Sequence, residues 1–172
     1  LVTGSDLTGA AYDVTATYTY DAMGNVLTQG GASEQAFEYN ILGQVTKITD
    51  AEGKSETYEY NFLGLPLKKT DRRGVVTTYA YNVWQQPTQV TAVLGDKTQS
   101  VSYTYDMLGN RKTMTDELGT TSYTYDFLSR LTSESRNGTI KTYEWDKYGD
   151  KRGVEVDLPG TPGAYDAAYT YS

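Results

Sequence analysis

The stretch Tyr103-Thr-Tyr-Asp-Met-Leu-Gly-Asn110 decides the fold, because similar stretches recur along the chain. Tyr18-Thr-Tyr-Asp-Ala-Met-Gly-Asn25 is nearly identical to it. The second aromatic residue of each copy stands at position 20, 39, 60, 81, 105, 125, 145 or 171, which gives intervals of 19, 21, 21, 24, 20, 20 and 26 residues. A repeat of about 20 residues predicts a quasi-one-dimensional array of similar supersecondary units.

Each copy has the pattern of a strand that runs into a tight turn. Its two aromatic residues are two positions apart, so in a strand they share one face, while the Thr, Glu or Ala between them takes the wetter face. The Asp or Asn that follows suits the first position of a type I turn, where its side chain accepts the amide two residues on. Gly at the fourth position adopts positive φ at little cost. The chain then returns as a second strand, for example over residues 44–49.

A second turn follows in most copies. Asp50-Ala-Glu-Gly53, Asp71-Arg-Arg-Gly74 and Asp116-Glu-Leu-Gly119 share one Asp-x-x-Gly pattern, and Arg136-Asn-Gly138 predicts a type I′ turn. Two strands in each copy predict an all-β, antiparallel meander of about 14–16 strands, and no helical periodicity is present. We expect one β-sheet region over residues 1–172, with regular repeats over about 18–152, looser ends at 1–17 and 153–168, and a loop insertion at 158–163. Because the chain begins at Leu1, we expect it to be a piece of a longer one.

Some positions depart from the pattern. Gln85 and Ser129 replace the turn Gly, while Pro66 and Pro87 stand early in the return strands, where Pro is tolerated at a strand start. Residues 83–87 are therefore expected to be the most irregular. The third turn position is always large and apolar, which predicts that the turn tips fold inward or stack on the next repeat. These residues are Met23, Leu42, Leu63, Trp84, Leu108, Leu128 and Tyr148.

Composition excludes several classes of function. The chain has no Cys and no His, which excludes disulfides, thiolate metal sites and His-based triads. Its net charge of −7 excludes the basic stripe of a nucleic-acid partner, and no apolar run approaches the length of a membrane span. With 17 Tyr, 2 Trp and 3 Phe, we expect aromatic residues to supply much of the core. Buried Tyr hydroxyls need partners, and a wet cavity supplies them.

The recurring Tyr-x-Tyr-Asp-x-x-Gly-Asn string resembles the YD repeat of Rhs-family proteins, and the resemblance covers residues 18–171. The resemblance implies a long, curved or spiralling β-sheet that forms part of a hollow shell. Bacterial Rhs proteins and toxin-complex subunits enclose a C-terminal toxin in such a shell, and teneurins carry a similar shell at the animal cell surface. The repeat signature comprises Tyr18, Tyr20, Asp21, Gly24, Asn25, Tyr39, Asn40, Gly43, Tyr58, Tyr60, Asn61, Gly64, Tyr79, Tyr81, Asn82, Tyr103, Tyr105, Asp106, Gly109, Asn110, Tyr123, Tyr125, Asp126, Tyr143, Trp145, Asp146 and Gly149.

The resemblance implies a non-catalytic structural segment that encloses or displays a toxin or effector domain. Its partners are then the rest of its shell and an enclosed C-terminal domain, in a secreted or cell-surface protein without cofactors, nucleic acid or membrane insertion. The self-cleaving Asp-Pro-x-Gly-Leu signature of the bacterial family is missing, because the chain has no Asp-Pro pair. As a fragment, the sheet would expose strand edges, which predicts edge-to-edge self-association.

Three alternatives stay open beside this interpretation. The repeated Asp and Asn could form a calcium ladder, although Asx turns explain them better and no EF-hand loop is present. A carboxylate pair could make a glycosidase, although the sequence singles out no pair. The aromatic face could bind carbohydrate by stacking, as an adhesive surface module, with Trp84 and Trp145 as first candidates, whereas cross-strand aromatic pairs that hold the sheet explain most of the Tyr residues.

Overall fold

The structure, a computed structural model, describes residues 2–5, 11–14, 16–31 and 34–165, with side chains over 16–31 and 34–160. These residues form strands and turns but no helix, so none of them forms a helix able to cross a membrane. The eighth copy of the repeat, at Tyr169 and Tyr171, lies outside them. The strands are β1 (Val2–Ser5), β2 (Ala11–Val14), β3 (Thr17–Tyr20), β4 (Val26–Gly30), β5 (Gln35–Tyr39), β6 (Val45–Asp50), β7 (Ser55–Tyr60), β8 (Pro66–Thr70), β9 (Val76–Tyr81), β10 (Pro87–Leu94), β11 (Lys97–Tyr105), β12 (Arg111–Asp116), β13 (Gly119–Tyr125), β14 (Leu131–Arg136), β15 (Thr139–Trp145), β16 (Lys151–Leu158) and β17 (Thr161–Tyr165).

Strands β3 to β17 form a 15-stranded sheet in which strands adjacent in the chain are adjacent in the sheet. β1 and β2 pair as a separate two-stranded antiparallel sheet. The predicted all-β antiparallel meander of about 14–16 strands is confirmed. Pro66 and Pro87 begin β8 and β10, as expected of Pro in a sheet.

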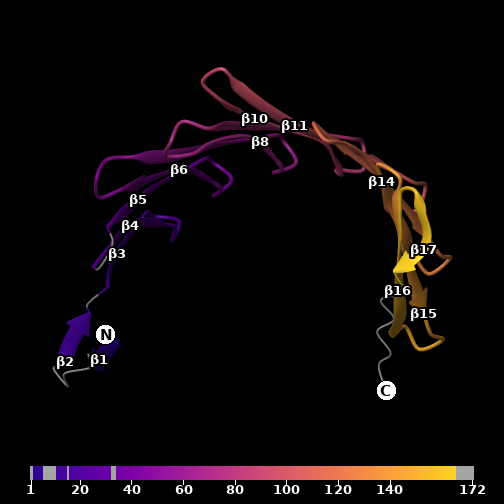
Figure 1. The fold of residues 1–172 in the computed structure, drawn as a ribbon. Helices are drawn as coiled ribbons and strands as arrows, with labels where there is room; N and C mark the ends of the chain where they lie inside the picture. Colours follow the sequence, from indigo (N-terminus) through magenta and orange to yellow (C-terminus); the bar gives the residue numbers. More distant parts are fainter. Residues whose placement is uncertain (1, 6–10, 15, 32–33, 166–172) are drawn as a thin grey trace. The chain divides into compact units, whose positions relative to one another are not determined.

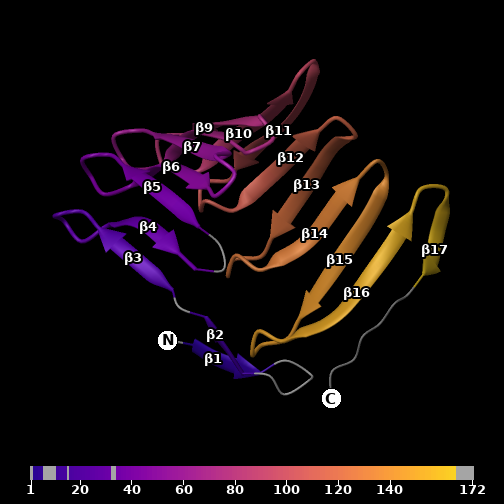
Figure 2. The same cartoon turned by 90° about the vertical axis from the view of Figure 1, so that its left-hand side faces the viewer.

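The chain divides into two compact units, one of residues 1–79 and 92–97 and the other of residues 80–91 and 98–172. In the first unit, β3 to β8 follow one another as antiparallel hairpins (Figure 1). In the second unit, β11 to β17 do the same (Figure 2). Within each unit, the described strands contact only their neighbours in the sheet.

The expectation of an aromatic core is wrong for the described side chains. None of their hydrophobic residues is buried, and Thr121, at 7% exposure, is the one buried side chain among them. In β5 and β7 the paired aromatic residues are half-buried and the residue between them is exposed, which confirms the predicted alternation. The aromatic side chains pack against strands of the same sheet, and one layer cannot bury them fully.

Two local predictions need correction, one at residues 158–163 and one at residues 83–87. Residues 158–163 are not a loop insertion, because β16 and β17 form a hairpin there around Pro159 and Gly160. The Asp-x-x-Gly turn predicted at 116–119 is confirmed, because Asp116 pairs with Gly119 across a two-residue loop and Asp116 Oδ1 accepts the Leu118 amide over 2.9 Å.

Residues 83–87 are not irregular in backbone. Their turn is closed by the same bonds as the others, with Asn82 N–H donating to the Gln86 carbonyl over 3.0 Å. The 24-residue interval arises from the next hairpin, whose strands β10 and β11 have 8 and 9 residues. The type I′ prediction at Arg136-Asn-Gly138 is confirmed by positive φ at both Asn137 (49°) and Gly138 (83°).

Candidate functional site

The turn after each aromatic pair has the same hydrogen bonds throughout the described repeats. In residues 106–110, Asp106 N–H donates to the Asn110 carbonyl over 2.9 Å, and Gly109 N–H donates to the Asp106 carbonyl over 3.1 Å. Asp106 Oδ1 accepts the amides of Leu108 and Asn110, each over 2.9 Å. The predicted Asx turn is confirmed, and Asp and Asn are interchangeable there because both offer Oδ1. The other turns of this kind begin at Asp21, Asn40, Asn61, Asn82, Asp126 and Asp146.

The fourth residue of each turn adopts positive φ, as the Gly pattern predicts. Gly109 has φ of 87°, and the replacements Gln85 and Ser129 are held at 65° and 60°. The strand register shifts beside the turn, for example between Thr104 and Tyr105. A type I turn followed by a left-handed residue and a bulge is a common hairpin closure that strengthens the local twist.

The second aromatic residue of a repeat donates a side-chain hydrogen bond to the hairpin before it. We call this hydrogen bond the lateral aromatic bond. The Tyr125 hydroxyl donates to the Arg111 carbonyl over 2.9 Å, and the Tyr39 hydroxyl donates to the Val26 carbonyl over 2.7 Å. Trp145, which replaces this Tyr, keeps the bond by donating Nε1–H to the Leu131 carbonyl over 2.7 Å. The acceptor always belongs to the first residue of the return strand, beside the bulge. Tyr60 and Tyr105 make the same bond to Val45 and Pro87.

Polar side chains also join one turn to the next. Gln44 Nε2 donates to the Gly64 carbonyl over 3.2 Å, and Gln86 Nε2 donates to the Gly109 carbonyl over 3.0 Å. Arg130 stands at the same position of its repeat and reaches the first residue of the next turn, with Nη1 donating to the Asp146 carbonyl over 2.9 Å. Successive hairpins are therefore tied together at their turns as well as through the strands.

The apolar residues at the turn tips do not fold inward. Leu108 is 73% exposed and Met107, beside it, is 104% exposed. They stack only partly on the adjacent repeat, since Trp84 shares a hollow of about 390 Å³ with Met107 and Leu108. The hydrogen bonds of the turn hold the second and third residues at its outer end, which points their side chains to solvent.

Charged residues lie on the aromatic face of the sheet. In the first unit, Lys69 Nζ lies 3.0 Å from Glu56 Oε2, and the Tyr58 hydroxyl donates to the same oxygen over 2.7 Å. The hydrogen bonds from Tyr58 and Lys69 lower the pKa of the Glu56 carboxyl. Burial raises the pKa of the Tyr58 hydroxyl, with the Glu56 bond adding to the shift. In the second unit, Lys141 Nζ pairs with Glu134 Oε1 over 2.7 Å.

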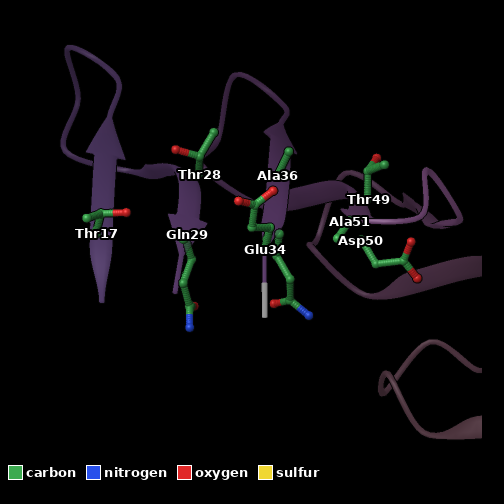
Figure 3. A pocket seen from close by; sticks show the side chains of 10 residues that line it. Thr17, Thr28, Gln29, Glu34, Ala36, Thr49, Asp50 and Ala51 are labelled. Carbon is green, nitrogen blue, oxygen red and sulfur yellow. The ribbon is translucent and has the colours of Figure 1, made fainter. Parts of the chain in front are cut away.

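The turn carboxylates accept hydrogen bonds from the backbone amides of their own turns. The described residues include no cluster of three or more Asp or Glu able to hold a metal ion. A hollow of about 450 Å³ lies between β3, β4, β5 and β6, and Figure 3 shows Thr28 and Gln29 pointing to opposite sides of β4 there. Asp50 at this hollow accepts the amides of Glu52 and Lys54, so its carboxylate closes a turn.

The two tryptophans lie in different surroundings. Trp145, at the end of β15, is half-buried, with the Arg130 guanidinium 5.7 Å and the Lys151 ammonium 5.5 Å from its ring. Trp84 lies at a turn tip and is 78% exposed. The structure gives Trp145 a lateral structural bond and leaves the ring of Trp84 open to solvent.

The linking side chains Gln44, Gln86 and Arg130 are not apparent from the repeat pattern. Their shared signal is position, since each directly follows the fourth turn residue and carries an N–H donor. The carbonyl that accepts each hydrogen bond belongs to the next hairpin, so the sequence of one repeat does not identify it.

Known structures share this fold. A Tc holotoxin pore from Photorhabdus luminescens matches with a TM-score of 0.75 and 21% identity, over 88% of this chain and 9% of that one. The crystal structure of TcdB2-TccC3-TEV matches with a TM-score of 0.76 and 22% identity, over 95% of this chain and 10% of that one. The chain therefore spans about a tenth of the length of these proteins. No curated protein matches it.

The repeated turn and lateral aromatic bond agree with a family match. Residues 11–110, more than half of the chain, match the model of the teneurin YD-shell family. The same turn continues beyond the matched residues, at Asp126 and Asp146. The chain belongs to the teneurin YD-shell family, a family of YD-repeat proteins.

Proposed function

We propose that the chain is a non-catalytic structural segment of a YD-repeat shell that encloses or displays a toxin or effector domain. The observation that supports this most is the lateral aromatic bond, as at Tyr125 and Arg111. Each hairpin is fixed by the one before it, and the described side chains include no buried hydrophobic residue. Such a sheet can be extended by adding further repeats beside the existing strands, which suits the wall of a shell.

The proposal extends to the setting of the chain. Residues 1–172 form one YD-repeat region, with regular repeats over 18–152. Its partners are the rest of the shell and an enclosed C-terminal domain, and the protein is secreted or displayed at the cell surface. The absence of Cys and His and the structural use of the turn carboxylates, as in Asp106, favour a role without catalysis.

Protection of a second domain tests this function. The native polypeptide would be isolated by an antibody against this sequence, sized, and treated with protease before and after mild urea. We expect a polypeptide many times larger than 19.0 kDa, with an internal domain cleaved only after urea has opened the shell. A native polypeptide near 19.0 kDa, or a partner domain cleaved equally fast without urea, would contradict the proposal.

Carbohydrate binding is a second candidate, favoured by the solvent-exposed ring of Trp84. Sugar rings stack on exposed aromatic faces, and Asp106, which lines the hollow beside Trp84, can accept a hydroxyl proton. On a glycan array, Trp84→Ala should abolish any binding with an unchanged circular dichroism spectrum. Trp145→Ala is the comparison, because it removes a structural bond and should lower stability. An array with no binding by the original chain would remove this candidate.

A further inference from the structure

The second unit carries a row of exposed apolar side chains at one turn-bearing end of its strands. Here, an edge of the sheet means the line of turns at one end of the strands, not an unpaired outer strand. The turns at 82–86, 106–110, 126–130 and 146–150 all lie on this edge, because each joins an odd-numbered strand to the next strand. Exposed fractions in the row run from 59% at Leu128 to 104% at Met107. The apolar turn row consists of Val83, Trp84, Met107, Leu108, Phe127, Leu128 and Tyr148.

The opposite edge of the same unit lacks such a row. Its turns contain Glu117 with Leu118, Asn137 with Gly138, and Pro159 with Gly160, so Leu118 is the one large apolar side chain in these described turns. Turn tips are ordinarily polar, and a contiguous exposed apolar patch marks an interaction surface. Because only one of the two lines of turns is rich in exposed apolar side chains, we place the interaction surface at the apolar turn row.

We propose that the apolar turn row binds the same row of a second copy of this chain, related by a two-fold axis. Consecutive turns are two strands apart, which is about 9.5 Å. An identical row keeps this spacing along its whole length, whereas a helix presents equivalent residues every seven positions, about 10.5 Å apart. A second copy therefore matches all four turns in register.

A two-fold axis reverses the order of the turns and brings complementary side chains together. Met107 then faces the partner's Phe127, a favourable sulfur–aromatic pair. Trp84 faces the partner's Tyr148 and the neighbouring ammonium of the partner's Lys147, which suits an aromatic and a cation–π contact. The turn at 82–86 carries no charge, so the charged turn at 146–150 meets no like charge there.

The surface has a suitable shape and size. The hollow of about 390 Å³ between Trp84, Met107 and Leu108 can receive an aromatic ring of the partner. Three aromatic residues of the row, Trp84, Phe127 and Tyr148, supply roughly 450–750 Å² when fully covered. With the four aliphatic residues, the row approaches the about 800 Å² per partner of a standard interface.

Sedimentation of the full chain over a range of concentrations tests the proposal. We expect a monomer–dimer equilibrium, and Phe127→Lys should raise the dimer dissociation constant at least tenfold with an unchanged circular dichroism spectrum. Leu118→Lys is the matched control, because Leu118 is 77% exposed but lies on the opposite edge. Its dissociation constant should not change.

A charge pair tests the register. Met107→Lys alone should weaken the dimer, whereas Met107→Lys combined with Phe127→Glu should restore it, since the two substitutions face each other only across a two-fold axis. A chain that stays monomeric, or a dimer that persists in Phe127→Lys by pairing of open strand edges, would overturn the proposal. Equal loss of dimer in Leu118→Lys, or no recovery in the double variant, would also overturn it.

Discussion

At the scale of single residues, the first turn position decides how the hairpin responds to pH. Asp106 and Asn61 accept the same two backbone amides through Oδ1. Only the Asp carries a charge that can be titrated. The side-chain hydrogen bond from Asn110 and the backbone amides lower the pKa of the Asp106 carboxyl below its usual range.

Acid should therefore weaken the Asp turns and spare the Asn turns. Because the folded pKa of Asp106 is lowered, its contribution is complete above the unfolded pKa of about 3.9 and is lost as pH falls through the folded value. Amide exchange between pH 5 and pH 2 should show falling protection at Leu108 and Asn110. Protection at Leu63 and Leu65 should stay constant, and Asp106→Asn should remove the dependence. An equal decline in both turns would count against this account.

The fourth turn position carries backbone strain in two repeats. Gln85 and Ser129 have φ of 65° and 60°, a region that costs a side-chain-bearing residue about 1–2 kcal/mol. Gly avoids this cost but loses roughly 0.5–1 kcal/mol of chain entropy. We expect Gln85→Gly and Ser129→Gly each to raise the free energy of unfolding by up to about 1 kcal/mol in urea titrations. Gln86→Gly, which removes the bond to Gly109, should lower it, and a gain there would contradict the explanation.

At the scale of the hairpin, the O–H or N–H donor of the second aromatic residue links two hairpins by a hydrogen bond that the ring alone cannot make. The Tyr125 hydroxyl and the Trp145 N–H make the same bond to the preceding return strand. Two chemically different rings are accepted because both carry a donor at the outer end. The carbonyl beside the bulge would otherwise lack this partner from the neighbouring hairpin.

Tyr125→Phe should remove this bond and keep the ring. We expect a loss of about 1 kcal/mol in the free energy of unfolding, since the Arg111 carbonyl loses its donor. The matched control is Tyr123→Phe, because no described residue hydrogen-bonds the Tyr123 hydroxyl. Amide exchange should locate the loss in β12 and β13, and equal losses in both variants would show that the hydroxyl bond is unimportant.

At the scale of the whole molecule, stability is distributed over neighbour contacts. Within each unit, the described strands contact only the strands beside them. Arrays with such contacts have stabilities that approximate a sum over repeats and their interfaces. Damage to one hairpin should therefore remain near that hairpin.

Gly24→Val tests this locality. Gly24 has φ of 88°, and an added Cβ would meet no atom within 4 Å, so the cost comes from the backbone alone. We expect about 1–2 kcal/mol of local destabilisation. Amide protection should fall in β3 and β4 and remain in β13 to β16. Uniform loss along the chain would show cooperative unfolding instead.

Local chemistry explains how much the sequence could predict. The Asp106 turn, the positive φ at Gly109 and the alternating exposure all follow from one repeat, because their partners lie within a few residues. The bond from Tyr125 to Arg111 depends on the offset between two repeats, which no single repeat contains. The inward packing predicted for Leu108 is wrong, because an apolar side chain indicates that it needs to be covered but not which part of the chain or which partner covers it.

The lateral aromatic bond also gives the array a polarity. Its donor always belongs to the later hairpin and its acceptor to the earlier one, as in Tyr39 to Val26 and Tyr125 to Arg111. A nascent chain emerges from its N-terminal end, so every acceptor is in place before its donor is synthesised. Each finished hairpin is thus a template for the next, and the wall can be laid down in the order in which it is translated.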